Sequence, residues 1–280
     1  MNIEKINNKL LLTGTECFTL DETLDCGQAF RFTKNGDGIW EGVAFGKILR
    51  VSQDADGNIT FHDGCGDDFE TLWRTYFDLD TDYIRIAGIL SENEVLSRVY
   101  NNAVGIRIMR QEPFETLCSF IISQNNNIPR IKGIISKLCE NFGNEIAPGY
   151  YTFPTAERLA ALSEEDLAPL RAGFRNRYIL SAAQMVAGGS IDLESLRTAP
   201  MAEARAELKR ICGVGDKVAE CTLLFGLGRM EAFPIDVWMK RIMAELLPDG
   251  LPDFALPYAG IAQQYLFHYA RLNRIGVKKV

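Results

Sequence analysis

Hydrophobic and polar residues alternate in short runs through the first part of the chain. The alternating segments cover residues 9–14, 17–20, 29–33, 38–53 and 58–62, with clusters of Asn, Asp and Gly at 35–38 and 56–58. A repeat of two places every second side chain on the same face, which is typical of strands with one buried face. The pattern therefore predicts antiparallel strands joined by hairpin turns.

After Phe69 the hydrophobic residues recur every three or four positions, which predicts helices. The expected helices lie near residues 69–76, 82–99, 113–124, 128–141, 155–162, 174–187, 199–211, 216–227, 236–246 and 257–271. The predicted fold class is α+β, with an antiparallel sheet domain and a junction helix at 1–85 and a helical region at 86–280. No long polar linker separates the two parts, so a cleft between them is the default place for a site.

The charge is unevenly distributed over the 280 residues. Lys and Arg number 30 against 37 Asp and Glu, which gives a formal net charge of -7. Residues 1–85 hold 16 acidic and 8 basic side chains, so the acidic excess lies in this part. The remainder contains basic clusters at residues 171–177, 209–210, 240–241 and 271–279. The overall charge therefore does not exclude a nucleic-acid partner for the last two thirds of the chain.

Neither the start of the chain nor its cysteines indicate secretion. The N-terminal segment lacks the apolar core of a signal peptide, and no stretch of about 18 apolar residues occurs. The seven cysteines are odd in number and scattered, without a Cys-x-x-Cys pair. We therefore expect a soluble intracellular protein of the cytoplasm or nucleoid, with no disulfide framework, zinc site or iron–sulfur cluster.

The segment 208–239 carries the most informative motif. Two predicted helices flank the glycine hairpin Gly213-Val214-Gly215, which indicates a helix-hairpin-helix at about 201–227. Glycine permits backbone geometry that other residues resist, and the hairpin amides together with the following helix start form a site for a phosphate. The alternative is an ordinary turn between two helices, which is equally common.

Two candidate catalytic residues follow this hairpin. Lys217 opens the second helix among apolar neighbours, and such surroundings favour the uncharged amine, which is a nucleophile. Asp236 lies 19 positions later at the start of another predicted helix, where a carboxylate can also stabilise positive charge on a sugar ring. The alternatives are an ordinary surface lysine and a plain helix N-cap.

With these residues the chain resembles the helix-hairpin-helix (HhH-GPD) DNA glycosylases, and within them the bifunctional 8-oxoguanine DNA glycosylase/AP lyases. The resemblance spans nearly the whole chain and identifies Lys217 with the Schiff-base lysine and Asp236 with the essential aspartate. The tail after Asp236 lacks the four cysteines typical of the adenine and thymine-glycol enzymes. The resemblance implies excision of 8-oxoguanine opposite cytosine from damaged duplex DNA, by a monomer without metal or organic cofactor and without a membrane association.

The resemblance also implies a pocket for the damaged base. Gly27 matches the glycine whose carbonyl accepts the N7 hydrogen of 8-oxoguanine. Cys221 and Phe267 match the residues on the two faces of the flipped base, and Gln263 matches the reader of its Watson–Crick edge. Taken without the resemblance, these are a turn glycine, a small core residue and two positions of one helix.

Further positions match residues that contact DNA. Asn125 matches the asparagine that fills the space left by the flipped base, and Arg130 and Arg175 match arginines that contact the orphaned cytosine. Two matched positions depart from the eukaryotic pattern, since Phe174 stands at a wedging tyrosine and Trp238 at a histidine near a phosphate. Asn125 is otherwise an ordinary helix cap.

Two alternative functions stay open at this point. A non-catalytic helix-hairpin-helix module would use Lys217 for a phosphate and Asp236 only as a cap, and its binding would weaken with salt. A monofunctional alkylbase glycosylase would not require Lys217.

One more position differs from the eukaryotic pattern, because Gln124 replaces a serine beside Asn125. This difference affects the expected DNA contacts and leaves the catalytic residues unchanged.

Overall fold

The computed structural model describes residues 1–276, so Lys278 and Lys279 of the predicted basic cluster lie outside the described residues. The chain folds into two compact units. Unit 1 contains Met1–Gln28, Ser52–Met109 and the chain from Arg229 onward, and unit 2 contains Ala29–Val51 and Arg110–Gly228. This division differs from the predicted boundary near residue 85, which stays a prediction.

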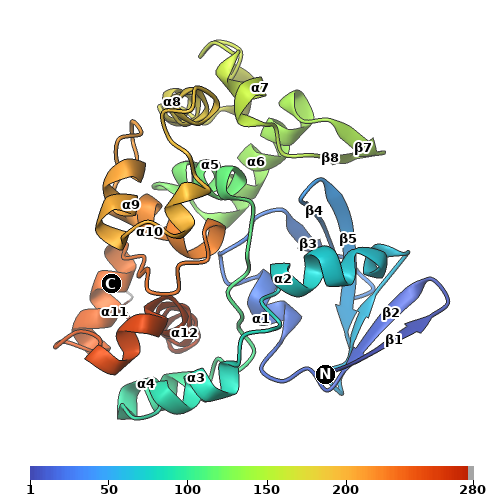
Figure 1. Ribbon diagram of the computed structural model, residues 1–280, viewed down its shortest axis with the longest axis vertical. Helices are drawn as coiled ribbons and strands as arrows, with labels where there is room; N and C mark the ends of the chain where they lie inside the picture. The colour runs from blue at the N-terminus through green and yellow to red at the C-terminus, as the bar shows by residue number, and fades with distance from the viewer. Residues whose placement is uncertain (277–280) are drawn as a thin grey trace. The chain divides into compact units, whose positions relative to one another are not determined.

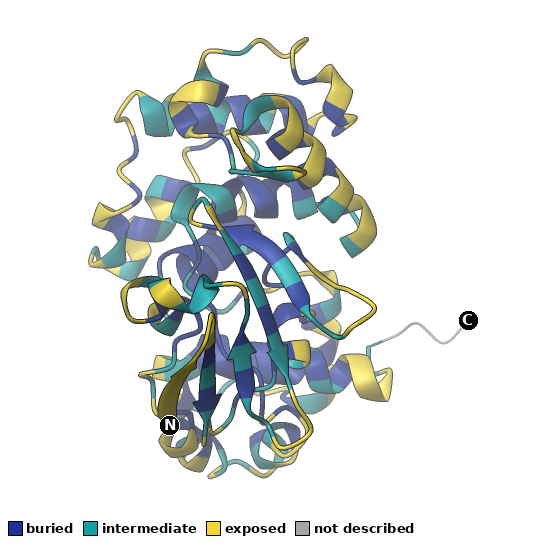
Figure 2. Cartoon of the chain, turned by 90° about the vertical axis from the view of Figure 1, so that its right-hand side faces the viewer, coloured by how far each residue is buried: buried dark blue, intermediate teal, exposed yellow. Residues whose placement is uncertain are grey.

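Strands β1, β2 and β6 belong to unit 1, and the first two are labelled in Figure 1. Strand β1 (Asn2–Ile6) pairs with β2 (Lys9–Thr13), and β2 pairs with β6 (Ile59–Phe61). Strand β2 alternates as expected, because Leu10 and Leu12 are buried while their neighbours are not. Strand β1 is exposed along its whole length, as Figure 2 shows in yellow beside the N-terminus.

Several helices of unit 1 pack against one of its long helices. Helix α12 contacts α4 and α11, and α3 contacts α4. The helical elements of unit 1 are α1 (Leu20–Leu24), the 3-10 helix Cys65–Asp68, the π-helical turn Phe69–Trp73, α2 (Arg74–Tyr76), α3 (Tyr83–Leu90), α4 (Glu94–Tyr100), α11 (Val237–Leu246), the 3-10 helix Asp253–Tyr258 and α12 (Ala259–Asn273).

Two predictions for unit 1 were wrong. The segment 17–20 does not form a strand, because the chain enters helix α1 at Leu20, where Leu20 and Leu24 share a buried helix face. The helix expected over 82–99 is two helices. Asn93 interrupts it, since its side chain accepts hydrogen bonds from the backbone N–H groups of Val95 and Leu96 and caps α4.

Unit 2 contains most of the remaining strands. Strand β3 (Phe32–Lys34) pairs antiparallel with β4 (Trp40–Ala44), and β4 pairs with β5 (Lys47–Gln53), whose last two residues belong to unit 1. The short strands β7 (Glu145–Ala147) and β8 (Tyr150–Tyr151) form a separate hairpin. Sequence analysis missed β1, β7 and β8, which are too short or too polar for a clear alternating pattern.

Helix α5 (Pro113–Ser123) is the central helix of unit 2. Every residue from Thr116 to Ile122 is buried, and α5 contacts α6, α8 and α10. Its Phe120 ring stacks on Phe225, with the ring centroids 5.4 Å apart. The helical elements of unit 2 are α5, α6 (Ile128–Phe142), α7 (Ala156–Ala160), the 3-10 helix Ala168–Leu170, α8 (Arg175–Ala187), the 3-10 helix Ser195–Arg197, α9 (Met201–Leu208), α10 (Asp216–Cys221) and the π-helical turn Thr222–Gly226.

Strands β1 to β6 come before the long helices along the chain, and of the described strands only the short hairpin of β7 and β8 follows α6, which confirms the predicted α+β class. Most of the expected helices are present within a few residues of their predicted ends. Within residues 1–276, no helix has the length and the hydropathy that a membrane crossing needs.

Candidate active site

The predicted hairpin joins α9 and α10 in unit 2. Gly213 has a φ of 82°, and a Cβ atom added there would lie 2.3 Å from ring atoms of Tyr178. The N–H of Val214 donates to the carbonyl of Ile211 at 3.0 Å. The Val214 amide is therefore engaged within the hairpin, and a phosphate at this turn would meet the neighbouring amides.

Lys217 is the second residue of α10 and is half-buried. Its Nζ donates a hydrogen bond to Ser123 Oγ at 2.9 Å and lies 4.6 Å from the centroid of the Phe120 ring. Among the residues that the structure describes, Lys217 forms no ion pair. Its amine therefore lies against a neutral hydroxyl and an aromatic face, without a carboxylate to hold it.

Cys221 lies one helical turn after Lys217 on α10. Its side chain is buried, with 2% of its surface exposed. The spacing of four places Cys221 on the same face of the helix as Lys217. This is the arrangement that the resemblance implies for a residue beside the flipped base.

The turn after α5 presents an asparagine. Asn125 is exposed and has a φ of 51°, in the left-handed region that asparagine tolerates better than most residues. The Arg175 guanidinium supports this turn by donating from Nη2 to the carbonyls of Gln124 and Asn125, the latter at 3.3 Å. Arg175 is 4% exposed, and burial followed by the nearby charge of Arg130 lowers the pKa of its guanidinium.

The N-terminal end of α8 presents an apolar ring. Phe174 is 50% exposed, which is unusual for so large a hydrophobic side chain. The guanidinium carbon of Arg175 lies 4.4 Å from the Phe174 ring centroid, and the Tyr178 ring lies edge-on at 5.6 Å. An exposed ring held from behind in this way is suited to stacking against a base.

In unit 1, Asp236 is the N-cap of α11. Its Oδ1 accepts a hydrogen bond from the backbone N–H of Met239 at 2.7 Å, and its backbone is extended. The other carboxylate oxygen accepts no hydrogen bond from residues 1–276. The cap therefore uses one carboxylate oxygen. Because Asp236 is exposed, the second oxygen is available for a further interaction.

Phe267 and Trp238 form a second pair in unit 1. Their ring centroids are 4.6 Å apart and the planes are nearly perpendicular. The indole Nε1–H of Trp238 donates to the carbonyl of Ile275 at 2.9 Å. The single N–H donor of Trp238 is therefore used within the protein, and its ring supports Phe267 from the side.

Gly27 and Gln263 are the remaining predicted contacts in unit 1. Gly27 has a φ of 84°, which glycine adopts without steric cost and which sets the direction of its backbone. The buried Gln263 side chain accepts a hydrogen bond through Oε1 from Gln264 at 2.9 Å. Its amide NH2 forms no hydrogen bond with the described residues, which leaves donors for a ligand.

Comparison with known proteins places the chain in a family. The model of the 8-oxoguanine DNA glycosylase N-terminal domain matches residues 9–117, and the model of the HhH-GPD superfamily base excision DNA repair proteins matches residues 118–249. The chain is 32% identical to the N-glycosylase/DNA lyase OGG1 of Arabidopsis thaliana, over 88% of this chain and 70% of that protein. The chain belongs to the 8-oxoguanine DNA glycosylase family.

Two solved structures agree with membership of the 8-oxoguanine DNA glycosylase family. The structure of MBOgg1 in complex with a low affinity DNA ligand has a TM-score of 0.90 and 41% identity, over 98% of this chain and 99% of that one. The Clostridium acetobutylicum 8-oxoguanine glycosylase/lyase, in complex with double-stranded DNA containing cytosine opposite 8-oxoguanine, has a TM-score of 0.90 and 36% identity over the same shares.

Sequence analysis missed three residues that support the candidate site. Ser123 and Phe120 contact Lys217 from α5, and no local motif links residues so far apart in the chain. Gln28 fixes the segment after Gly27, since its Nε2 donates to the carbonyl of Arg107 at 2.8 Å and its Oε1 accepts from Met109 N–H at 3.0 Å. Only the adjacency of Gln28 to Gly27 could have suggested it.

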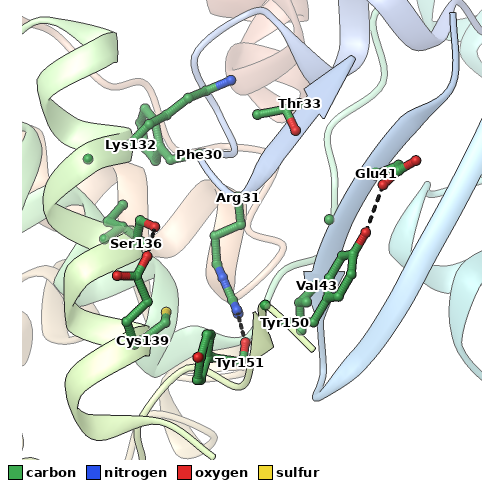
Figure 3. A pocket seen from close by; sticks show the side chains of 15 residues that line it. Phe30, Arg31, Thr33, Glu41, Val43, Lys132, Ser136, Cys139, Tyr150 and Tyr151 are labelled. Atoms are coloured by element: carbon green, nitrogen blue, oxygen red, sulfur yellow. Dashed lines mark hydrogen bonds between the residues drawn. The ribbon is translucent and has the colours of Figure 1, made fainter. Parts of the chain in front are cut away.

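A separate cavity of about 420 Å³ lies in unit 2, lined by residues of α6, β3, β4 and β8 (Figure 3). Two of its polar side chains are engaged with neighbouring groups, since Arg31 donates to the carbonyl of Tyr151 and Tyr150 Oη donates to Glu41 at 2.7 Å. None of the predicted site residues lines it.

Among residues 1–276, no group of three or more His, Cys, Asp or Glu side chains is placed to hold a metal ion.

Proposed function

We propose that this protein is a bifunctional DNA glycosylase/AP lyase that excises 8-oxoguanine, preferentially opposite cytosine, from duplex DNA in base excision repair. The environment of Lys217 carries the proposal, because the residue is half-buried, has no ion-pair partner among the described residues and places its amine against a hydroxyl and a ring. The relatives with glycosylase and lyase names support the same activity. The protein acts as a monomer on damaged duplex DNA in the cytoplasm or nucleoid.

The chemistry begins with the uncharged amine of Lys217. Its lone pair forms a bond to C1′ of the damaged nucleotide while the glycosidic bond breaks, and the departing base takes the electron pair and then a proton. The exposed oxygen of Asp236 stabilises the positive charge that develops on the sugar. The nitrogen then loses a proton, and the sugar ring opens as the C1′–O4′ bond breaks, with O4′ taking the electron pair and a proton. This gives the imine, and removal of a C2′ proton then expels the 3′ phosphate.

Damage recognition is assigned to four residues. The Gly27 carbonyl accepts the N7 hydrogen that 8-oxoguanine has and guanine lacks, Gln263 reads the Watson–Crick edge, and Cys221 and Phe267 contact the two faces of the base. A single hydrogen bond whose loss leaves a buried group unpaired is worth about 1 to 3 kcal/mol, or roughly tenfold to a hundredfold. Further selectivity therefore comes from easier extrusion of the damaged base or from the requirement that the base docks fully before Lys217 and Asp236 align with C1′.

The DNA contacts are assigned to the exposed turns and the hairpin. Asn125 fills the space left by the flipped base, Phe174 wedges beside it, and Arg130 and Arg175 contact the orphaned cytosine. The backbone amides of Gly213 and Gly215, on either side of the engaged Val214 amide, bind the DNA phosphates, and Trp238 lies near another phosphate. A plug is physically needed because extrusion of a base costs a few kcal/mol. The proposed chemistry calls for no metal or organic cofactor.

Borohydride trapping tests the proposal directly. The protein is incubated with a duplex containing 8-oxoguanine opposite cytosine, beside an undamaged duplex, and borohydride reduces any imine to a stable adduct. We expect an adduct with the damaged duplex for the wild type and none for Lys217→Gln. The exposed lysine of α6 supplies a matched control, and Lys137→Gln is expected to form the adduct at the wild-type rate.

The same reaction mixture distinguishes the competing functions. Release of free 8-oxoguanine without an adduct would identify a monofunctional glycosylase. Neither adduct nor free base, with intact salt-sensitive binding to DNA, would identify a binding module. Either result would overturn the bifunctional assignment.

A further inference from the structure

The contacts of the Lys217 amine come from the last turn of α5. Ser123, the final residue of that helix, accepts the hydrogen bond from Nζ at 2.9 Å, and the ring of Phe120 lies 4.6 Å from the same nitrogen. Helices α5 and α10 pack against each other within unit 2. The two α5 residues therefore hold the end of the lysine side chain from two directions.

The proton of Ser123 has a different partner. Ser123 Oγ donates a hydrogen bond to the Phe120 carbonyl at 2.8 Å. A serine hydroxyl has one proton and two lone pairs, so once that proton is given to the carbonyl the oxygen meets Lys217 only as an acceptor. The amine must then direct an N–H towards Ser123.

This polarity matters for a nucleophile. An uncharged amine has a single lone pair, and a hydroxyl that donated to it would occupy the electrons that have to attack C1′. Because Ser123 accepts, the lone pair stays available while one N–H holds the nitrogen in place. The Phe120 ring limits the remaining movement of the side chain.

The end of α5 explains why the carbonyl is available. Gln124, the residue after Ser123, donates its backbone N–H to Ile121 rather than to Phe120, since the chain leaves the helix at this point. The Phe120 carbonyl is thus one of the unsatisfied carbonyls that every helix end leaves. The Ser123 side chain satisfies it, as serine does at three-residue spacing.

We propose that Ser123 is a positioning residue for the Lys217 amine: its hydroxyl, oriented by the Phe120 carbonyl, accepts from the amine and leaves the nitrogen lone pair free for attack on C1′. The proposal rests on the proposed function, in which Lys217 is the nucleophile. Loss of the acceptor leaves the lysine side chain free to adopt unproductive orientations. Misplacement of a reacting group by about 1 Å is enough for a hundredfold loss of rate.

The test compares Ser123→Ala, which removes the acceptor, with Ser123→Thr, which retains a hydroxyl on the same carbon. Ser119→Ala is the matched control, because Ser119 is buried one turn earlier on α5 and forms no hydrogen bond with Lys217. For each variant the rate of borohydride trapping is measured at saturating 8-oxoguanine DNA, together with the dissociation constant for the DNA. Thermal unfolding is recorded to verify that each variant is folded.

For Ser123→Ala we expect trapping to slow by about 10- to 100-fold with the dissociation constant within about twofold of wild type. Ser123→Thr is expected to recover trapping to within about threefold of wild type, and Ser119→Ala to trap at the wild-type rate. A purely structural role would lower DNA affinity and thermal stability along with the rate. A lower trapping rate at an unchanged DNA affinity therefore indicates that Ser123 positions the Lys217 amine.

Two results would overturn the assignment of Ser123. One is wild-type trapping by Ser123→Ala, and the other is a Ser123→Thr variant that is folded and binds DNA but traps as slowly as Ser123→Ala. In both cases the wild type still forms a Lys217-dependent adduct, so the proposed function stands. Absence of any adduct in the wild type would overturn the proposed function itself, and Ser123 with it.

Discussion

In the proposed mechanism, Asp236 combines a structural and a chemical task in one carboxylate. One oxygen caps α11 through the Met239 N–H, and the second accepts no hydrogen bond within residues 1–276. The sequence by itself favoured the cap and allowed both roles, because a carboxylate at a helix start satisfies free N–H groups and lies at the positive end of the helix. Substitution can separate the two tasks, since asparagine caps a helix nearly as well as aspartate but carries no charge.

We expect Asp236→Asn to retain the unfolding free energy to within about 0.5 kcal/mol and to lower the rate of base release by about 100-fold or more, because the charge that stabilises the sugar cation is lost. Asp236→Ala should lose the cap as well, which costs about 1 kcal/mol of stability. Denaturant unfolding and single-turnover excision of 8-oxoguanine measure the two effects. Wild-type excision by Asp236→Asn would show that the carboxylate only caps the helix.

At the scale of elements, the helix-hairpin-helix depends on two glycines in different ways. Gly213 has a left-handed backbone and faces the Tyr178 ring, which leaves no space for a side chain. Gly215 has an ordinary extended backbone, and a Cβ atom there meets no atom within 4 Å. The first glycine is therefore required by the fold, whereas the second leaves open space at the start of α10 for the proposed phosphate.

Alanine at the two positions should affect different properties, namely stability at Gly213 and DNA affinity at Gly215. Gly213→Ala is expected to lower the unfolding free energy by about 2 kcal/mol, because the added Cβ clashes with Tyr178 and strains the backbone. Gly215→Ala should leave stability within about 0.5 kcal/mol and weaken binding to duplex DNA by roughly tenfold, since its methyl group occupies the path of the DNA backbone. Thermal unfolding and a binding titration check both. Unchanged DNA affinity of Gly215→Ala would remove the hairpin from the DNA interface.

At the scale of the whole molecule, a buried ion pair connects pH to stability. Arg31 Nη1 lies 3.0 Å from Glu115 Oε2, and both side chains are almost entirely buried in unit 2. Burial raises the pKa of Glu115 to about 7, and the charge of Arg31 opposes this increase without overcoming it. The folded protein therefore holds a proton on Glu115 at pH values where the unfolded chain has released it.

This difference makes Glu115 lower the stability as the pH rises. Below a pH of about 4.5 the carboxyl is protonated in both states, and between about 4.5 and 7 the folded state binds more protons, so the unfolding free energy falls with pH. The full difference is on the order of 3 kcal/mol. We expect Glu115→Gln to remove most of this pH dependence, as measured by denaturant unfolding at pH 5 and pH 8. Parallel pH dependence in the wild type and the variant would contradict the assignment.

Most of the fold could be predicted because strands and helices differ in the spacing of their buried side chains. The failures occur where a local polar contact competes with that spacing, as at Asn93, whose side chain starts a new helix within a longer hydrophobic pattern. Leu20 and Leu24 fit a helix face, although the preceding residues alternate like a strand. In short segments, capping and tertiary burial therefore decide between two patterns that the residues alone allow.

The sequence by itself determined the candidate chemical groups of this protein: the lysine after the glycine hairpin, the aspartate at a helix start, and the glycine and aromatic positions that the resemblance implies. These depend on residue type and on spacing within one or two helical turns. Only the tertiary structure decided that Ser123 accepts from Lys217, that Arg175 holds the Asn125 turn and that Trp238 supports Phe267. Such contacts join residues far apart along the chain, and their direction depends on how the elements pack and on which polar groups a helix end leaves unsatisfied.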